Sequence, residues 1–463
     1  MSTTAPTPPP QSRAPAAEGS LRDRLARHML VDGFPLVVDL GLSRGSRLVD
    51  RESGRRYLDL HMSFAANPLG WNPPQLADDA DALAELGRAA VNKPANSDLC
   101  TQPLVDFVET FARVLGDPAL PHLFFVEGGA LAVENALKCA FDWKHGHNEQ
   151  HGRARGPVSA LHLTTAFHGR SGYTMSMTNT DPKKTDGFPF FAWPRIDAPV
   201  MRFPVAEHDE RTREMEGRSL AQAERAFLGH PHQIACFIAE PVQGEGGDNH
   251  LSARFLQAMQ LLCHEHDALF VLDEVQTGVG GTGTAWAYQQ LGLEPDVVAF
   301  AKKVQLGGIM AGRRVDDVEP NVFTRSGRIN STWGGGLVDM VRSRRILEVI
   351  EQEDLFARAR TAGARLLAGL QDLERAHPDL VGNARGRGLM CAFDLPTPAL
   401  RDEVVRRLFH REQVIVLPSG SVSVRVRPAL TITDAEIDEA LTAITRAVGD
   451  LEAGTLEEDG RPA

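Results

Sequence analysis

Four groups of polar or flexible residues lie just after short apolar runs, at the positions where a parallel sheet would present them along one edge. They are Gly128-Gly129-Ala130 after 123–126, Phe167-His168-Gly169-Arg170 after 160–163, Asp273-Glu274-Val275-Gln276 after 269–272, and Lys302 after 297–301. Open parallel sheets bind ligands beyond the carboxyl ends of their strands. These residues are therefore the first candidates for chemistry.

The pair Asp273 and Lys302 indicates one kind of chemistry. A desolvated lysine with a lowered pKa condenses with an aldehyde, and an aspartate across the site can keep a pyridine nitrogen protonated. Taken singly, an aspartate at a strand end is more often a helix cap, and a lysine there is usually a solvated surface residue. Together they indicate pyridoxal phosphate. The two glycines before the helical segment 131–145 would offer helix N–H groups to its phosphate, although a plain turn explains adjacent glycines equally well.

The elements that must position these residues are typical of an α/β fold. The runs 123–126, 160–163, 234–239, 269–272 and 297–301 are apolar on both faces and are separated by stretches long enough for a helix. This pattern predicts a mostly parallel sheet covered by helices. Apolar residues at helical spacing within 254–267, between two of the runs, indicate a βαβ unit. Residues 47–60 predict a hairpin, and Ser20 with Asp23 a capped helix from Leu21.

The same pattern divides the chain into five parts. We expect a disordered tail over 1–19, an N-terminal segment over 20–75 that packs with the smaller domain, a large cofactor-binding domain over 76–336, a smaller C-terminal α+β domain over 337–451, and a second disordered tail over 452–463. In the C-terminal part, the sequence pattern predicts helix up to about 377. Strands at 389–393, 414–417 and 422–426 and a helix from Asp434 follow.

Composition excludes several other classes of protein. Of 463 residues, 49 are Lys or Arg and 61 are Asp or Glu, a net charge of -12 that argues against nucleic acid or an anionic membrane surface as the main partner. The longest apolar runs hold about six residues, far short of the roughly 20 that a membrane span needs. Five scattered cysteines and the lack of a secretory signal favour the cytoplasm. The histidines at 145, 147 and 151 lack a defensible ligand geometry, so we expect no metal site.

Several longer motifs resemble the class III aminotransferases, which are fold-type I pyridoxal phosphate enzymes. The matching segments are 240–246 (EPVQGEG), 272–278 (LDEVQTG), 295–296 (PD), Lys302 with the glycines near 307, and 332–335 (TWGG), and the resemblance covers roughly 25–450. It implies a large mostly parallel-sheet domain and a smaller α+β domain.

Within this class, the segments 127–136, 167–173, 284–288 and 330–333 resemble the members that act on L-lysine. The implied reaction moves the ε-amino group of L-lysine to 2-oxoglutarate and gives 2-aminoadipate 6-semialdehyde and L-glutamate in two half-reactions. Alternatives inside the class are transfer from ornithine or 4-aminobutyrate, or an aminomutase. Outside it, the alternatives are a cofactor-holding regulator without turnover and a nucleotide-dependent oxidoreductase.

The resemblance also implies a role for each candidate at the cofactor. Lys302 would be the Schiff-base lysine and proton shuttle, with the adjacent Lys303 as a rival, and Asp273 would hold the pyridine nitrogen. The interval of 29 residues between Asp273 and Lys302 favours Lys302. The remaining implied contacts are Gly129 and Ala130 at the phosphate, Phe167 on the ring, Gln276 at the phenolic oxygen, and Thr332 reaching the phosphate across a homodimer interface.

Two arginines and a glutamate would select the substrates. Arg425 matches the arginine that binds the 2-carboxylate of the keto acid, and Glu245 matches the carboxylate that neutralises it when an ω-amine is bound. Arg170 would bind the distal carboxylate, where a planar fork is favourable. Arg427 could replace Arg425 by a shift of two residues. We also expect Asn330 to form a polar wall near the substrate, whereas His168 is interpreted as structural and 62–67 receives no role.

Overall fold

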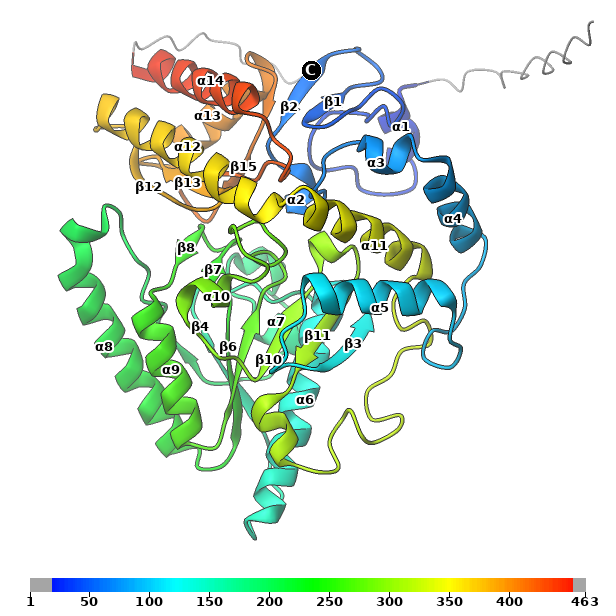
Figure 1. Ribbon diagram of the computed structural model, residues 1–463. Coiled ribbons are helices and arrows are strands. Elements are labelled where there is room, and N and C mark those ends of the chain that lie inside the picture. Colours follow the sequence, from blue (N-terminus) through cyan, green and yellow to red (C-terminus); the bar gives the residue numbers. More distant parts are fainter. Residues whose placement is uncertain (1–18, 453–463) are drawn as a thin grey trace, which may run out of the picture.

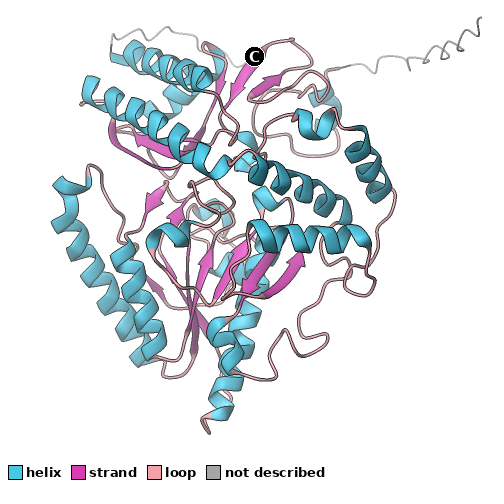
Figure 2. Cartoon of the chain, viewed as in Figure 1, coloured by secondary structure: helices cyan, strands magenta, loops and turns pink. Residues whose placement is uncertain are grey.

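The structure is a computed structural model that describes residues 19–452, so nearly all of the two predicted tails, 1–19 and 452–463, lies outside the described residues. A large sheet flanked by helices forms one part of the molecule, and a smaller sheet with its own helices covers one end of it (Figure 1). In the larger part, helices lie on either side of the strands (Figure 2). The predicted fold class is confirmed.

The large sheet has seven strands. Their order is β3 (His122–Val126), β11 (Gly307–Ala311), β10 (Val297–Phe300), β9 (Leu269–Asp273), β6 (Ile234–Ala239), β4 (Ser159–Leu163) and β5 (Arg195–Ile196). The pairs from β10 through β5 are parallel, whereas β11 is antiparallel to both of its neighbours. All five predicted strands are present in this sheet.

Strand β11 was not predicted, because its sequence begins with two glycines, which are unfavourable in most strands. The packing explains them. A Cβ at Gly308 would lie 2.6 Å from the carbonyl oxygen of Phe124 and 2.5 Å from the ring of Phe300. Only glycine lets this strand fit between its two neighbours.

Helices cover both faces of the large sheet. In β9, Leu269 and Val271 face the cluster built around α6 (Gly129–Gln150), while Phe270 and Leu272 face the larger cluster that includes α9 (Ala253–Glu265). This alternation follows from the period of two in a strand. The other helices of this part are α5 (Gln102–Val114), α7 (Gly172–Met177), α8 (Val205–Gly229), α10 (Ala287–Leu291) and the short turns η1 (Pro182–Lys184), η2 (Lys302–Val304) and η3 (Arg313–Asp317).

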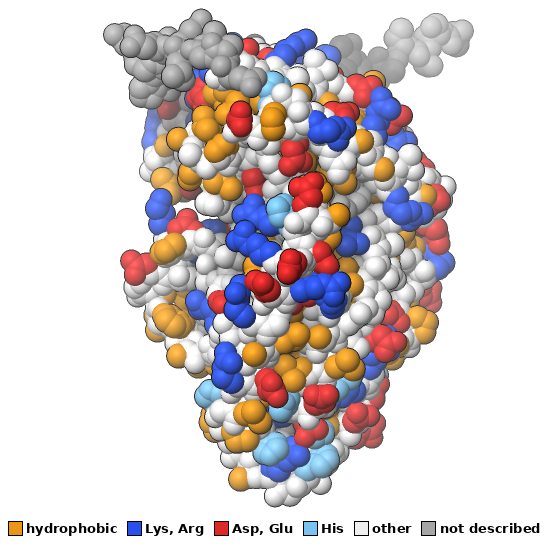
Figure 3. Space-filling model, turned by 90° about the vertical axis from the view of Figure 1, so that its left-hand side faces the viewer, with side chains coloured by type: hydrophobic (Ala, Val, Ile, Leu, Met, Phe, Trp, Pro, Cys, Tyr) orange, Lys and Arg blue, Asp and Glu red, His pale blue; other side chains and the backbone are white. Residues whose placement is uncertain are grey.

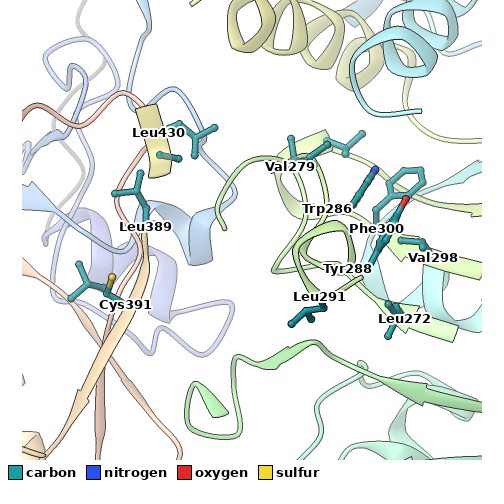
Figure 4. Close-up of a cluster of buried hydrophobic side chains, with 14 of the residues drawn as sticks. Leu272, Val279, Trp286, Tyr288, Leu291, Val298, Phe300, Leu389, Cys391 and Leu430 are labelled. Carbon is teal, nitrogen blue, oxygen red and sulfur yellow. The ribbon is translucent and has the colours of Figure 1, made fainter. Parts of the chain in front are cut away.

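The smaller C-terminal sheet is antiparallel. Its order is β12 (Gly382–Arg387), β13 (Met390–Asp394), β16 (Ser423–Val426) and β15 (Leu417–Ser419), and its helices are α12 (Leu355–Ala376), α13 (Pro398–His410) and α14 (Asp434–Glu452). Strand β12 (GNARGR) and helix α13 were not predicted, because β12 has almost no apolar residues and α13 is interrupted by charges. Leu389, Cys391 and Leu430 of this part belong to the same buried cluster as Leu272 and Trp286 (Figure 4).

The N-terminal segment joins the C-terminal part through a shared sheet. Strands β1 (Arg47–Val49) and β2 (Arg56–Asp59) form the predicted hairpin, and β14 (Val414–Ile415) pairs in parallel with β2. Helix α1 (Leu21–Ala26) has the predicted capping box of Ser20 and Asp23. The segment also contains α2 (Met62–Ala65) and the start of α3 (Pro74–Ala77), and α4 (Ala80–Ala90) follows it. The helix α11 (Leu337–Gln352) follows the predicted domain boundary but packs on α5 and α4, so it connects the two parts.

A small hairpin and the surface complete the description. Strands β7 (Val242–Gln243) and β8 (Asn249–His250) pair beside the large sheet. Acidic and basic side chains are interspersed on the face shown in Figure 3. Over residues 19–452, every helix is too short or too polar to cross a bilayer.

Trp286 provides a test of this core. Its ring is fully buried and its Nε1 donates a hydrogen bond of 2.7 Å to the carbonyl of Leu115. The substitution Trp286→Phe keeps an aromatic ring but leaves that buried carbonyl unpaired, so we expect the free energy of unfolding, measured by urea titration, to fall by about 1–3 kcal/mol. The control Leu228→Ala, at a side chain 66% exposed, should change it by less than about 0.5 kcal/mol. A Trp286→Phe protein as stable as the parent would contradict this packing.

Candidate active site

A cavity of about 670 Å³ lies at the carboxyl ends of β4, β6, β9 and β10. The four predicted groups of residues meet there: its lining includes Gly128, Gly129, Ala130, Phe167, His168, Gly169, Arg170, Asp273, Val275, Gln276 and Lys302. The cavity is also lined by Glu245, which the sequence analysis selected, and by Glu240 and Lys184, which it did not. The sheet therefore brings the predicted strand ends together.

Lys302 rather than Lys303 lines this cavity. Burial lowers the pKa of Lys302, and the negative charges of Asp273 and Glu240 offset this effect only in part. Lys303 points elsewhere: its Nζ donates hydrogen bonds to the carbonyl oxygens of Gln276 (2.7 Å) and Gly278 (3.0 Å). Burial and the charge of Lys302 lower the pKa of Lys303 to about 7. The geometry favours Lys302 over its neighbour as the reacting amine.

Asp273 is the last residue of β9 and pairs in register with Ala299 of β10, three residues before Lys302. Its carboxylate is buried and accepts two hydrogen bonds. Oδ1 accepts from the backbone N–H of Val275 at 3.0 Å, and Oδ2 accepts from Nδ1 of His168 at 2.8 Å. A charge at this depth needs such donors.

His168 therefore contacts Asp273 directly, although the sequence analysis treated it only as structural. Burial opposes the charged ring, but the hydrogen bond and the charge of Asp273, together with the charge of Glu240, outweigh it and raise the pKa of His168. Nε2 of His168 is buried and has no hydrogen-bond partner among residues 19–452. The signal available in the sequence was its place in the same strand-end group as Phe167.

Glu240 is a second buried carboxyl that the sequence analysis did not select as a site residue. It follows β6, and its two oxygens accept hydrogen bonds from the backbone N–H groups of Phe167 (2.9 Å) and Gly244 (3.1 Å). Burial raises the pKa of Glu240 to about 7; the charge of His168 opposes this shift and that of Asp273 adds to it. Glu240 thus joins the segment that carries Phe167 to the segment that carries Glu245.

The N-terminus of α6 forms another wall. The helix begins at Gly129, after Gly128 with a φ of 81° that favours glycine. A Cβ at Gly129 would lie 2.9 Å from the side chain of Val275, so only glycine permits this approach. The first N–H groups of a helix have no partner within it and favour an anion. The N-terminus of α6 therefore suits a phosphate group.

Arg425 and Glu245 form an ion pair at the cavity. Nη2 of Arg425 lies 3.0 Å from Oε2 of Glu245, and Nη1 donates to the carbonyl of Gly244 at 3.2 Å. Burial alone would raise the pKa of Glu245, but the charges of Arg425 and Lys184 lower it. Neither arginine is itself a lining residue, but Arg425 contacts Glu245, which lines the cavity, whereas Arg427 pairs with the buried Asp248, which does not. The structure thus favours Arg425 over Arg427 for the role at the cavity.

Arg170 and Phe64 lie toward the outside of the cavity. Arg170 is exposed, and within the described part of the chain its side chain forms no hydrogen bond or ion pair. Phe64 and Ala66 also line the cavity, which gives a location to the segment 62–67. The backbone there is left-handed at four consecutive residues, with φ from 43° at Met62 to 63° at Ala65.

Asn330 and Thr332 do not reach the cavity of their own chain. Both are exposed in the loop between η3 and α11, where the carbonyl of Thr332 accepts a hydrogen bond of 3.5 Å from Ser97. Spacing along the chain could not show this, because the loop folds against the segment between α4 and α5. A role for these two residues at the cavity requires a second subunit.

The residues present fit pyridoxal phosphate. The side-chain amide of Gln276 lines the cavity and forms no hydrogen bond in the described region, which leaves its N–H groups available to an acceptor there. The set comprises an amine for the aldehyde (Lys302), a carboxylate for the pyridine nitrogen (Asp273), an amide for the phenolic oxygen (Gln276) and helix N–H groups for the phosphate. A metal site has no comparable support, since residues 19–452 hold no cluster of three or more His, Cys, Asp or Glu ligands.

Comparisons with known proteins agree with a pyridoxal phosphate enzyme. Residues 31–448 match the family Aminotransferase class-III. The L-lysine-epsilon aminotransferase of Amycolatopsis lactamdurans is 58% identical over 441 residues, 95% of this chain and 98% of that protein. The 4-aminobutyrate aminotransferase of Schizosaccharomyces pombe is 32% identical and covers 91% of this chain and 90% of its own. A solved lysine aminotransferase from M. tuberculosis has a TM-score of 0.91 at 59% identity and covers 93% of this chain and 98% of its own.

The contact between His168 and Asp273 predicts an effect on cofactor binding. The substitution His168→Leu removes the donor to Oδ2, and a hydrogen bond to a charged group contributes about 1.5–3 kcal/mol. We therefore expect the Kd of the apoprotein for pyridoxal phosphate, measured by absorbance titration, to rise roughly tenfold to hundredfold. His168→Asn, whose amide can still donate, should lose less affinity. Equal losses in both variants would contradict a role for this hydrogen bond.

Proposed function

This chain belongs to the class III aminotransferases, which are pyridoxal phosphate enzymes, and from this premise we propose that it is an L-lysine 6-aminotransferase. It moves the ε-amino group of L-lysine to 2-oxoglutarate and forms 2-aminoadipate 6-semialdehyde and L-glutamate. The observation that carries this proposal is the much higher identity to L-lysine-epsilon aminotransferases than to 4-aminobutyrate aminotransferases. The arrangement of charges around the cavity supports it.

Lys302 moves the proton in this proposal. When bound, pyridoxal phosphate supplies an aldehyde that condenses with amines and a ring that acts as an electron sink. The lowered pKa of Lys302 favours a neutral amine, which is the form that accepts a proton. In the first half-reaction its Nζ would take the proton from the ε-carbon of L-lysine and pass it to the former aldehyde carbon of the cofactor. In the second it would take a proton from that carbon and deliver it to C2 of 2-oxoglutarate.

The neighbouring residues hold and orient the ring. Asp273, fixed by His168, keeps the pyridine nitrogen protonated, and Gln276 donates to the phenolic oxygen. Phe167 packs on the ring face. The N-terminus of α6 at Gly129 and Ala130 binds the phosphate through backbone N–H groups, because neither side chain carries a hydroxyl.

L-lysine binds with the ion pair between Glu245 and Arg425 closed. Its ε end carries no carboxylate, so Glu245 neutralises the arginine beside the reacting carbon. The α-carboxylate of the substrate then lies at the far end of the cavity, where Arg170 has no competing ion pair within the described residues. Asn330 of a second subunit completes the polar wall.

2-Oxoglutarate binds with this ion pair open. Its C1 carboxylate adjoins the reacting carbon and takes the place of Glu245 on Arg425, with bidentate geometry available to the guanidinium. Its C5 carboxylate forms an ion pair with Arg170. One cavity thus serves two substrates that differ in charge at the reacting end.

We also propose a homodimer located in the cytoplasm. Thr332 and Asn330 are exposed in their own chain, and Trp333 beside them is 46% exposed, which suits a surface that meets a second copy. All five cysteines are free thiols, as expected in a reducing compartment. Thr332 of one subunit then contacts the phosphate bound by the other.

Amine donors test the proposed reaction. Purified enzyme should form L-glutamate from 2-oxoglutarate faster with L-lysine than with L-ornithine or 4-aminobutyrate, and faster turnover of L-ornithine would refute the substrate assignment. Lys302→Ala should lower the turnover rate at least roughly 10²- to 10⁴-fold, the usual contribution of a proton-transferring group. Borohydride reduction followed by peptide mass spectrometry should place the cofactor on Lys302 and not on Lys303.

Mixed dimers test the role of Thr332 across the interface. A hybrid of one Lys302→Ala subunit and one Thr332→Ala subunit, isolated with two affinity tags, contains one site with both residues intact if Thr332 acts on the partner's site. We then expect about half of the parental activity per dimer at limiting pyridoxal phosphate. If Thr332 served its own subunit, neither site would be intact and the hybrid would be no more active than the Thr332→Ala dimer.

A further inference from the structure

Lys184 is a partly buried cation at the cavity that the reaction described above does not use. It ends the short turn η1, after α7, and its side chain is only 13% exposed. Its Nζ donates to Oε1 of Glu245 at 2.7 Å and to Oγ1 of Thr180 at 3.1 Å. The same ammonium lies 5.0 Å from the centre of the Phe167 ring. Lys184 is therefore fixed between Phe167, which would contact the cofactor ring, and Glu245, which would act in substrate binding.

Glu245 consequently has a different cation at each oxygen. Lys184 binds Oε1, and Arg425 binds Oε2 at 3.0 Å. The three side chains come from three separate segments: the turn η1, the loop between β7 and β8, and strand β16. Ionised together, they carry one net positive charge.

This charge matters when the second substrate binds. If Lys184 were absent, the pair of Glu245 and Arg425 would be neutral, and an incoming carboxylate would leave two anions with one cation in a poorly hydrated site. An uncompensated charge of this kind is costly. With Lys184 present, the incoming carboxylate completes two ion pairs: Arg425 with the substrate, and Lys184 with Glu245.

We propose that Lys184 is a positioning residue that holds Glu245 when Arg425 binds the 2-oxo acid. This inference rests on the proposed function and extends it to the exchange between substrates. Lys184 acts through Glu245: it provides the carboxylate with a partner in the open arrangement, so that opening the ion pair does not leave a buried anion. L-lysine binds with the ion pair closed and does not need this second partner.

The two half-reactions separate this role from a merely structural one. Lys184→Met keeps the length and removes the charge, Lys184→Arg keeps a cation, and Lys183→Met changes an exposed neighbour in the same turn. Each half-reaction is followed by stopped-flow absorbance of the holoenzyme, first with L-lysine alone and then, after amine loading and removal of lysine, with 2-oxoglutarate alone.

We expect Lys184→Met to raise the apparent Kd for 2-oxoglutarate roughly tenfold to hundredfold, as expected for loss of a hydrogen bond to a charged group. The half-reaction with L-lysine should change little, Lys184→Arg should restore much of the affinity, and Lys183→Met should behave as the parent. Equal damage to both half-reactions, or no change in the 2-oxoglutarate step, would overturn the proposal.

A binding measurement keeps this test independent of the amine donor. Glutarate has two carboxylates and no oxo group, so it can bind to Arg425 and Arg170 without reacting. Calorimetric titration of the holoenzyme should show weaker glutarate binding to Lys184→Met than to the parent and Lys183→Met. If the parent fails to use L-lysine, the proposed substrate is wrong, whereas unchanged glutarate binding in Lys184→Met would count against the role of Lys184.

Discussion

A carboxylate and an amine at the ends of two neighbouring parallel strands are the constraint on which this site depends. Asp273 ends β9 and Lys302 follows β10, and neither charge is favourable in a partly dry cavity without compensation. The fold meets the two requirements differently. Asp273 receives hydrogen bonds from His168 and from the backbone, which stabilise its charge, while burial lowers the pKa of Lys302 and favours the neutral amine. The acid and the base of the site thus differ because their surroundings differ.

The second set of charges lies between the two parts of the molecule. Glu245 belongs to the loop beside the large sheet, whereas Arg425 lies on β16 of the C-terminal sheet. Their ion pair therefore connects the cofactor wall to the smaller sheet across the cavity. Because the pair spans this junction, the arrangement of the substrate site depends on how the two parts pack, and the shared buried cluster in Figure 4 fixes that packing.

Sequence reasoning located the strands whose two faces are both apolar, and with them Asp273, Lys302 and the start of α6. It missed β11 and β12, where glycine or charge replaces the apolar pattern. It also missed the roles of His168 and Lys184, since each acts through a partner far away in the chain: Asp273 is 105 residues from His168, and Glu245 is 61 residues from Lys184. Periodicity describes which way a residue faces but not which residue it meets.

The proposed roles of Arg170 and Arg425 require different freedom of movement. In the reaction we propose, the carboxylate of L-lysine lies two carbon–carbon bonds farther from its reacting carbon than the C5 carboxylate of 2-oxoglutarate lies from C2. A distal group that serves both substrates must therefore move, and Arg170 is exposed and has no ion pair in the described chain. The proximal carboxylate is present in only one substrate and always at the same distance from the reacting carbon. A fixed, buried guanidinium with an exchangeable partner suits that demand, and Arg425 is held in this way by the strand β16, by the carbonyl of Gly244 and by Glu245.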